Sequence, residues 1–167
     1  MSPETPCILA VDTAGPVVGV ALEGPRGPRA WSGRVIRGAE SALGEALEEI
    51  LDGVDTLDLV AVSVGPGAFT SLRVGVSMAL GLAMAHGCRL LPLSSLALRA
   101  EISDSERVLS LLDARKGRAY GAFYERRDGA LLRVGEEVDW PPEKVVALAG
   151  PGAFEAVGEG ACLWGDL

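Results

Sequence analysis

The chain has 167 residues, of which 49% are hydrophobic, and a formal net charge of -8 at pH 7. This length allows one ordinary domain or two small lobes around a hydrophobic core, and the apolar content excludes a disordered chain. The acidic balance excludes a protein that holds nucleic acid unaided, because such binding needs clustered Lys and Arg to neutralise phosphates.

The first half of the chain predicts a hairpin followed by alternating helices and strands. In the first helix, Leu43, Leu47 and Ile50 recur at helical spacing while glutamates occupy the opposite side. Turn clusters rich in Gly and Pro separate the apolar runs. The expected elements are strands at Cys7–Val11, Val17–Leu22 and Arg29–Ile36, a helix at Ala39–Leu51, a strand at Leu57–Val64 and a helix at Thr70–His86.

The second half repeats this order. Strands are expected at Val108–Leu112, which ends in Asp113, and at Ala119–Tyr124, with a polar turn between them. A further strand is expected at Val145–Ala149, and the letters after it, Gly-Pro-Gly-Ala-Phe, also follow the strand that ends at Val64. Two matched elements in the same order predict an internal duplication, with lobes at 1–100 and 101–167.

Three stretches of the chain carry a resemblance to a known family. They read Ile8-Leu9-Ala10-Val11-Asp12-Thr13, Gly65-Pro66-Gly67-Ala68-Phe69-Thr70-Ser71-Leu72-Arg73-Val74-Gly75 and Leu112-Asp113-Ala114-Arg115-Lys116-Gly117. They are similar to the three signatures of the TsaB proteins, also called YeaZ. The resemblance implies an α/β, duplicated actin-like ATPase (ribonuclease H-like) fold. Family members usually continue through further C-terminal helices, so a shortened second lobe is expected.

The resemblance also implies a function. TsaB proteins pair with the catalytic relative TsaD, together with the ATPase TsaE, to support threonylcarbamoyladenosine modification of tRNA next to the anticodon. We therefore expect a non-catalytic subunit that forms a homodimer when alone and meets tRNA only through the complex. TsaD carries paired histidines for its metal, whereas this chain has one histidine, His86, so no metal or cofactor is expected.

Membrane association and secretion are not expected. No uncharged stretch reaches the roughly 18 residues that could span a bilayer, and the N-terminus lacks the basic start of a signal peptide. The three cysteines are widely spaced and form no Cys-x-x-Cys pair. A cytoplasmic protein follows from these observations.

Asp12 and Asp113 are weak candidates for nucleotide binding. They stand where actin-like relatives place carboxylates near phosphate and magnesium, but Thr13 and Ala114 follow them in place of glycine. The turn at 65–71 could present helix amides to an anion, or it could be a strand-to-helix corner capped by Thr70; the corner is favoured. The alternative function is a small ATP-dependent phosphotransferase or a peptidase-like enzyme of the actin-like superfamily.

The helix at 70–86 is apolar on two sides, and one sheet can cover only one of them. A second lobe could cover the other side, but a partner helix is favoured because Gly75 and Gly81 would allow close approach. Which side faces the partner stays open at this point. The residues expected at this partner interface are Leu43, Leu47, Gly75, Met78, Gly81 and Leu82.

Overall fold

The computed structural model describes residues 5–35 and 38–166, and the chain divides after Leu93 into two compact units. The first unit carries a five-stranded sheet and two long helices. Its elements are β1 (Ile8–Asp12), β2 (Val17–Glu23), β3 (Arg29–Arg34), α1 (Ala39–Ile50), β4 (Leu59–Gly65), α2 (Phe69–His86) and β5 (Arg89–Ser94).

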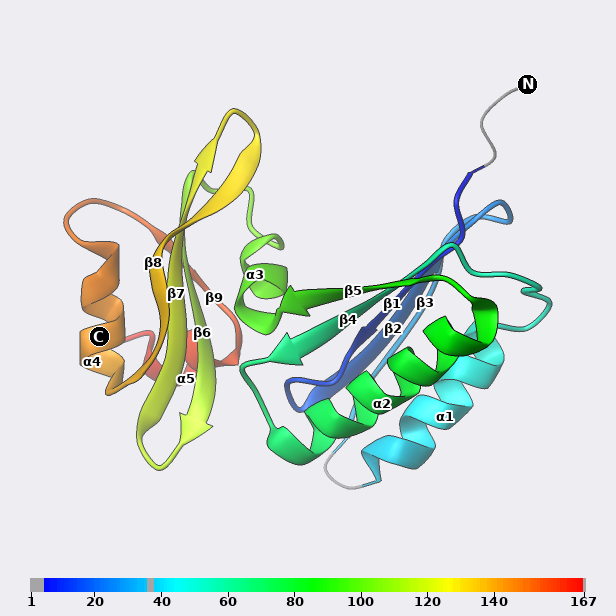
Figure 1. The fold of residues 1–167 in the computed structure, drawn as a ribbon. Helices are drawn as coiled ribbons and strands as arrows, with labels where there is room; N and C mark the ends of the chain where they lie inside the picture. The colour runs from blue at the N-terminus through cyan, green and yellow to red at the C-terminus, as the bar shows by residue number, and fades with distance from the viewer. Residues whose placement is uncertain (1–4, 36–37, 167) are drawn as a thin grey trace. The chain divides into compact units, whose positions relative to one another are not determined.

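The sheet of the first unit has the strand order β3-β2-β1-β4-β5, in which β1 pairs antiparallel with β2 and parallel with β4. Alternate residues of β1 and β2, such as Leu9 and Val18, point into one core, where they meet Leu43 of α1 and Ala79 of α2. Both helices therefore cover the same face of this sheet (Figure 1). Gly87, with φ 64°, ends α2 in the left-handed conformation that helix C-termini favour.

The second unit carries a four-stranded sheet in the order β8-β7-β6-β9. Three short α-helices and one 3-10 helix accompany it. The elements are α3 (Ser95–Ala100), β6 (Arg107–Arg115), β7 (Arg118–Arg127), β8 (Ala130–Trp140), α4 (Pro142–Val146), η1 (Ala147–Ala149), β9 (Glu155–Val157) and α5 (Glu159–Trp164).

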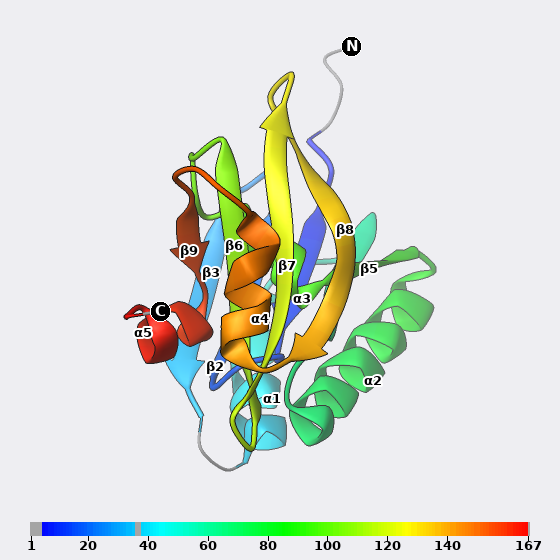
Figure 2. The same cartoon turned by 90° about the vertical axis from the view of Figure 1, so that its left-hand side faces the viewer.

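Both faces of the second sheet are covered by helices. Val108 and Leu112 of β6 pack with Leu96 of α3 on one face, whereas Leu109 of β6 packs with Val145 of α4 on the other. Figure 2 shows α4 lying across β6 and β7 on this second face. A central strand that is covered on both faces buries consecutive residues rather than alternate ones, which explains why residues 108–112 of β6 are all buried.

The two units repeat one plan, as the sequence predicts. Each has three antiparallel strands, then a helix, then a strand parallel to the first, so that β6 and β9 pair as β1 and β4 do. The five-letter repeat, however, is not structurally equivalent. Its first copy joins β4 to α2, whereas its second copy joins η1 to β9.

The strand predicted at Val145–Ala149 is wrong, because this segment is helical in α4 and η1. Pro142 occupies the first helical position, where its missing N–H has no intrahelical partner to lose. Val145 and Ala149, four residues apart, then face the same core. In the first unit, α2 begins at Phe69 with Ala68 as its N-cap, so Thr70 does not cap it.

The remaining predicted elements of both halves are confirmed within two residues at most ends. The predicted end of the third strand at Ile36 lies outside the described residues. The division into lobes at 1–100 and 101–167 stays a proposal. In the described part of the chain, no helix has both the length and the apolar character needed to cross a membrane.

Candidate functional site

Asp12 lies at the C-terminal end of β1, where its carboxylate holds a turn together. Its Oδ1 accepts a hydrogen bond from Ser63 Oγ at 2.5 Å and another from the Ala14 backbone N–H at 3.0 Å. The Thr13 backbone N–H in turn donates to Ser63 Oγ at 3.3 Å. The carboxylate therefore ties the end of β1 to the end of β4, its parallel neighbour.

The glycine-rich motif that follows β4 packs α2 tightly against this corner. A Cβ on Gly67 would lie 2.4 Å from the carbonyl oxygen of Ala14, and a Cβ on Gly75 would lie 2.3 Å from Thr13 Oγ1. Thr13 is fully buried, and its hydroxyl donates to the carbonyl oxygen of Ser71 at 2.8 Å. These two glycines are therefore explained by close packing between backbone and side chain.

Asp113 lies near the end of β6, in the second unit, and holds a turn of its own. Its Oδ1 accepts from the Arg115 backbone N–H at 2.8 Å, and its Oδ2 lies 3.1 Å from a guanidinium nitrogen of the same residue. The chain then passes through Lys116 and Gly117, and all three residues from Arg115 onward have positive φ. Both candidate carboxylates thus accept hydrogen bonds within the chain, Asp12 from Ser63 and Ala14 and Asp113 from Arg115.

The structure brings five of the six predicted interface residues into or around one core. Leu43 and Leu47 of α1 are buried there, and Met78 and Leu82 of α2 pack against them while half-buried. Gly75 is buried against Thr13. Only the sixth residue, Gly81, is exposed, with open space where a Cβ would stand.

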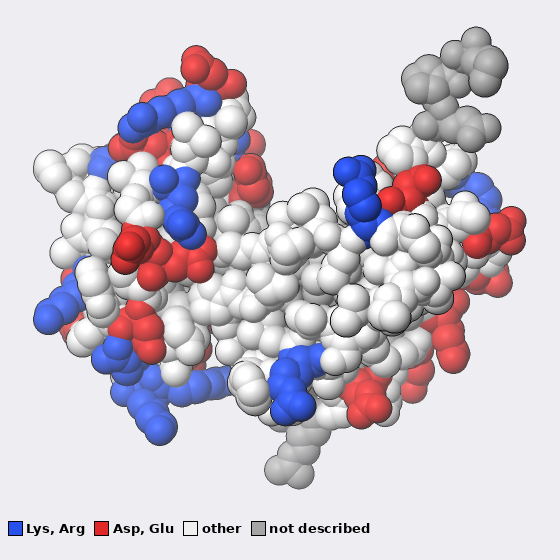
Figure 3. Space-filling model, in the orientation of Figure 1, with Lys and Arg blue, Asp and Glu red and all other residues white. Residues whose placement is uncertain are grey.

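The outward stripe of α2 carries large apolar side chains that sequence reasoning did not select. Phe69 is 73% exposed, Leu80 is 46% exposed and Met84 is 75% exposed. Leu80 and Met84 lie one turn apart on α2, and Gly81 lies to one side of both. The surface over α2 is largely uncharged, whereas acidic side chains gather over α1 (Figure 3). The exposed apolar stripe of α2 thus consists of Leu80 and Met84, with Gly81 beside them, and of Phe69 at the start of the helix, where the Arg73 guanidinium lies 5.5 Å from the ring.

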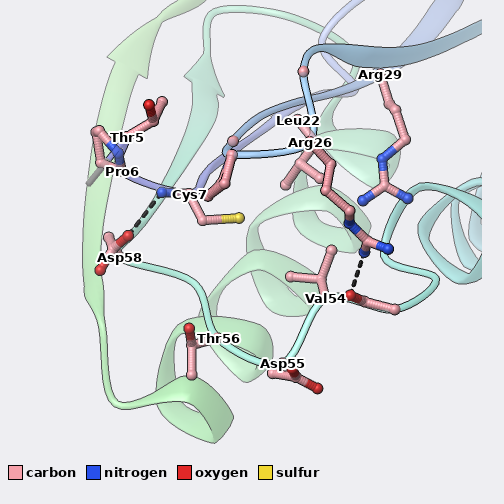
Figure 4. A pocket seen from close by; sticks show the side chains of 14 residues that line it. Thr5, Pro6, Cys7, Leu22, Arg26, Arg29, Val54, Asp55, Thr56 and Asp58 are labelled. Carbon is pink, nitrogen blue, oxygen red and sulfur yellow. Dashed lines mark hydrogen bonds between the residues drawn. The ribbon is translucent and has the colours of Figure 1, made fainter. Parts of the chain in front are cut away.

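A cavity of about 650 Å³ lies at the opposite end of β1, between the β2–β3 turn and the segment after α1 (Figure 4). Arg26 and Arg29 reach across it and donate hydrogen bonds to the carbonyl oxygen of Asp52. These guanidinium groups thus bind backbone carbonyl oxygens of the turn that follows α1. Burial raises the pKa of the Cys7 thiol, and the nearby Asp58 carboxylate adds to the effect. No sequence signal predicted this cavity.

The described residues contain no group of three or more His, Cys, Asp and Glu side chains that could hold a metal ion. The features that the structure does show are a tightly packed helix corner and an exposed apolar stripe on α2.

A family model described as TsaD: tRNA N6-adenosine threonylcarbamoyltransferase matches residues 28–161, which is most of the chain. The chain belongs to this family.

Individual relatives place it more narrowly, with the TsaB (YeaZ) proteins. The "tRNA threonylcarbamoyladenosine biosynthesis protein TsaB" of Escherichia coli is 28% identical over 183 residues, covering 96% of this chain and 74% of that protein. The protein of the same name from Haemophilus influenzae is 30% identical over 125 residues, covering 65% of this chain and 51% of that protein. The chain thus spans between half and three quarters of these relatives.

A solved structure agrees with this placement. The structure described as YeaZ from Pseudomonas aeruginosa superposes with a TM-score of 0.85 at 28% identity, covering 94% of this chain and 78% of that one. The TsaB resemblance and the duplicated actin-like fold are therefore confirmed.

Proposed function

We propose that this chain is an accessory subunit for threonylcarbamoyladenosine biosynthesis on tRNA, and that it pairs with a TsaD-type catalytic subunit. TsaE would join the assembly, tRNA would be met only through the complex, and the chain would act in the cytoplasm. The names and folds of the relatives support the pathway. The hydrogen bonds that Asp12 and Asp113 accept within the chain support a role without catalysis.

The exposed stripe of α2 is the observation that carries the partner role. Monomeric proteins rarely leave several large apolar side chains together in water, and such patches mark interfaces. Leu80 and Met84 would insert beside a partner helix, and Gly81 would let the two backbones approach closely. Leu43, Leu47 and Gly75 would support the stripe from beneath rather than touch the partner. The same stripe would form a homodimer when the partner is absent.

The test is a charged substitution on this stripe. Because Met84 is 75% exposed, Met84→Arg should leave the chain folded. It should weaken pairing with TsaD by at least about tenfold, since a buried anchor at an interface of standard size contributes about 2 kcal/mol or more. Ile102→Arg is the matched control, because Ile102 is 79% exposed and lies outside α1 and α2.

Circular dichroism would establish folding, and size-exclusion chromatography with TsaD would measure pairing. The proposal predicts that wild type and Ile102→Arg co-elute with TsaD while Met84→Arg elutes alone. Co-elution of a folded Met84→Arg variant at wild-type concentrations would contradict the interface. The alternative, an ATP-dependent phosphotransferase or peptidase-like enzyme, is not favoured.

A further inference from the structure

The hairpin between β6 and β7 presents three cations in four residues on a chain whose net charge is -8. Arg115 and Arg118 face each other across the end of the hairpin, and Lys116 and Gly117 form its two-residue loop. The side chain of Arg115 is 79% exposed and that of Arg118 is 46% exposed, and Lys116 is exposed as well. Figure 3 shows this blue cluster at the lower end of the second unit.

The backbone of this turn is strained by the residues that occupy it. Arg115 has φ 67° and Lys116 has φ 54°, in the left-handed region where a side chain costs about 1 kcal/mol or more. Two-residue hairpin loops with positive φ at both positions favour Asn-Gly or Asp-Gly, in which the first residue tolerates that region. Packing does not explain why Arg and Lys occupy positions 115 and 116, because both side chains are exposed to solvent.

Carboxylates hold the hairpin without burying its charges. Asp113 pairs with Arg115 at 3.1 Å, and Asp139 pairs with Arg118 at 2.7 Å. Exposed pairs of this kind contribute little to stability. The two carboxylates, with the Asp139 carbonyl oxygen that also accepts from Arg118, hold the base of the turn, and the exposed Lys116 lies at its tip.

An exposed aromatic ring flanks the same hairpin. Trp140, at the end of β8, pairs in register with Ala119 of β7 and is 43% exposed. Cations combined with an exposed aromatic ring are typical of surfaces that bind single-stranded or looped RNA, where phosphates meet the cations and bases stack on the ring. An acidic protein surface would use the cations but has no need for the ring.

We propose that the β6–β7 hairpin tip, formed by Arg115, Lys116 and Arg118 beside Trp140, contacts the phosphate backbone of tRNA once the chain is in its complex. The inference rests on the proposed function, which supplies the RNA. The acidic remainder of the chain explains why this contact needs a partner to bring the tRNA close. The chain would then contribute a positioning contact and leave the chemistry to TsaD.

The Lys116→Gly variant distinguishes a contact with tRNA from a purely structural role of Lys116. Glycine adopts positive φ without strain, so the variant should be as stable as wild type or more stable. It should nevertheless weaken tRNA binding to the complex and lower the slope of log affinity against log salt by about 1, as expected for one lost phosphate contact. Lys144→Gly removes the same charge from an exposed site on α4 and is the matched control.

Fluorescence anisotropy of a labelled tRNA transcript would measure binding to the complex of this chain with TsaD, and size-exclusion chromatography would first verify that each complex forms. We expect a reduced slope for Lys116→Gly and an unchanged slope for Lys144→Gly. Equal affinities and slopes for wild type and Lys116→Gly in intact complexes would overturn the inference and leave the proposed function standing. A Lys116→Gly variant that fails to join TsaD would overturn it too, because the hairpin would then be a protein contact. If wild type itself fails to join TsaD, the proposed function falls and this inference falls with it.

Discussion

Replacing Gly75 with alanine tests how closely α2 is packed against the end of β1. The added Cβ would stand 2.3 Å from Thr13 Oγ1, so the fully buried Thr13 side chain must move. Overpacking of this kind costs about 1–3 kcal/mol, and loss of the Thr13 hydrogen bond to Ser71 adds about 1 kcal/mol. The higher helix propensity of alanine offsets about 1 kcal/mol of this destabilisation.

The net expectation for Gly75→Ala is therefore destabilisation by about 1–3 kcal/mol, or a Tm lowered by roughly 2–12 °C in a chain of this size. Gly81→Ala is the internal control. It lies on the same helix and gains the same propensity, but its Cβ would meet nothing within 4 Å, so stabilisation by about 0.5–1 kcal/mol is expected. Urea unfolding followed by circular dichroism measures both. Equal stability of the two variants would refute the reasoning, because only the contact with Thr13 distinguishes them.

Further predictions concern the corner, catalysis and the second unit. Asp12→Ala should destabilise the chain by about 1–3 kcal/mol in urea unfolding, because Ser63 and a buried amide lose their acceptor. The isolated wild-type chain should show no magnesium-dependent ATP turnover, and turnover that disappears in Asp12→Ala would restore the enzyme alternative. Gly121→Ala should destabilise the second unit, since its Cβ would lie 2.0 Å from a methyl of Val145; a melting curve that matches wild type would contradict the packing of α4. Burial raises the pKa of Tyr124 to about 12, so its contribution to stability is complete below pH 10 and is lost as the pH rises toward 12. Tyr124→Phe should flatten this alkaline loss in unfolding experiments, and an unchanged pH profile would argue against the burial.

The elements of the first unit were predictable from the sequence because their patterns are regular. The periodic leucines of α1 and the apolar runs of β1, β2 and β4 each indicate one structure. The elements of the second unit were harder to predict from the sequence. β8 is exposed along most of its length and so carries no apolar run, and α3 and α5 have only six residues each. Val145–Ala149 looked like a strand because a short apolar run does not distinguish a strand from a buried helix turn.

The candidate site was predictable only in part. The sequence indicated that α2 contacts a partner. However, the pattern of a helix that is apolar on both sides does not show which side packs on its own sheet. The side of α2 that packs on the sheet depends on where β4 ends and α2 begins. In the structure, Gly75 faces the sheet and Met84 faces solvent. The hydrogen bond between Asp12 and Ser63 joins residues 51 positions apart, and no local pattern could have indicated it.

The amount of threonylcarbamoyladenosine formed on a tRNA transcript would show whether this chain supports the modification through its α2 stripe. The reaction would contain purified TsaD and TsaE from the same organism and the threonylcarbamoyl adenylate, with and without this chain, and nucleoside analysis by mass spectrometry would quantify the product. We expect efficient modification only when the wild-type chain is present, and little or none with Met84→Arg. Full modification without the chain, or equal support from Met84→Arg, would contradict this expectation.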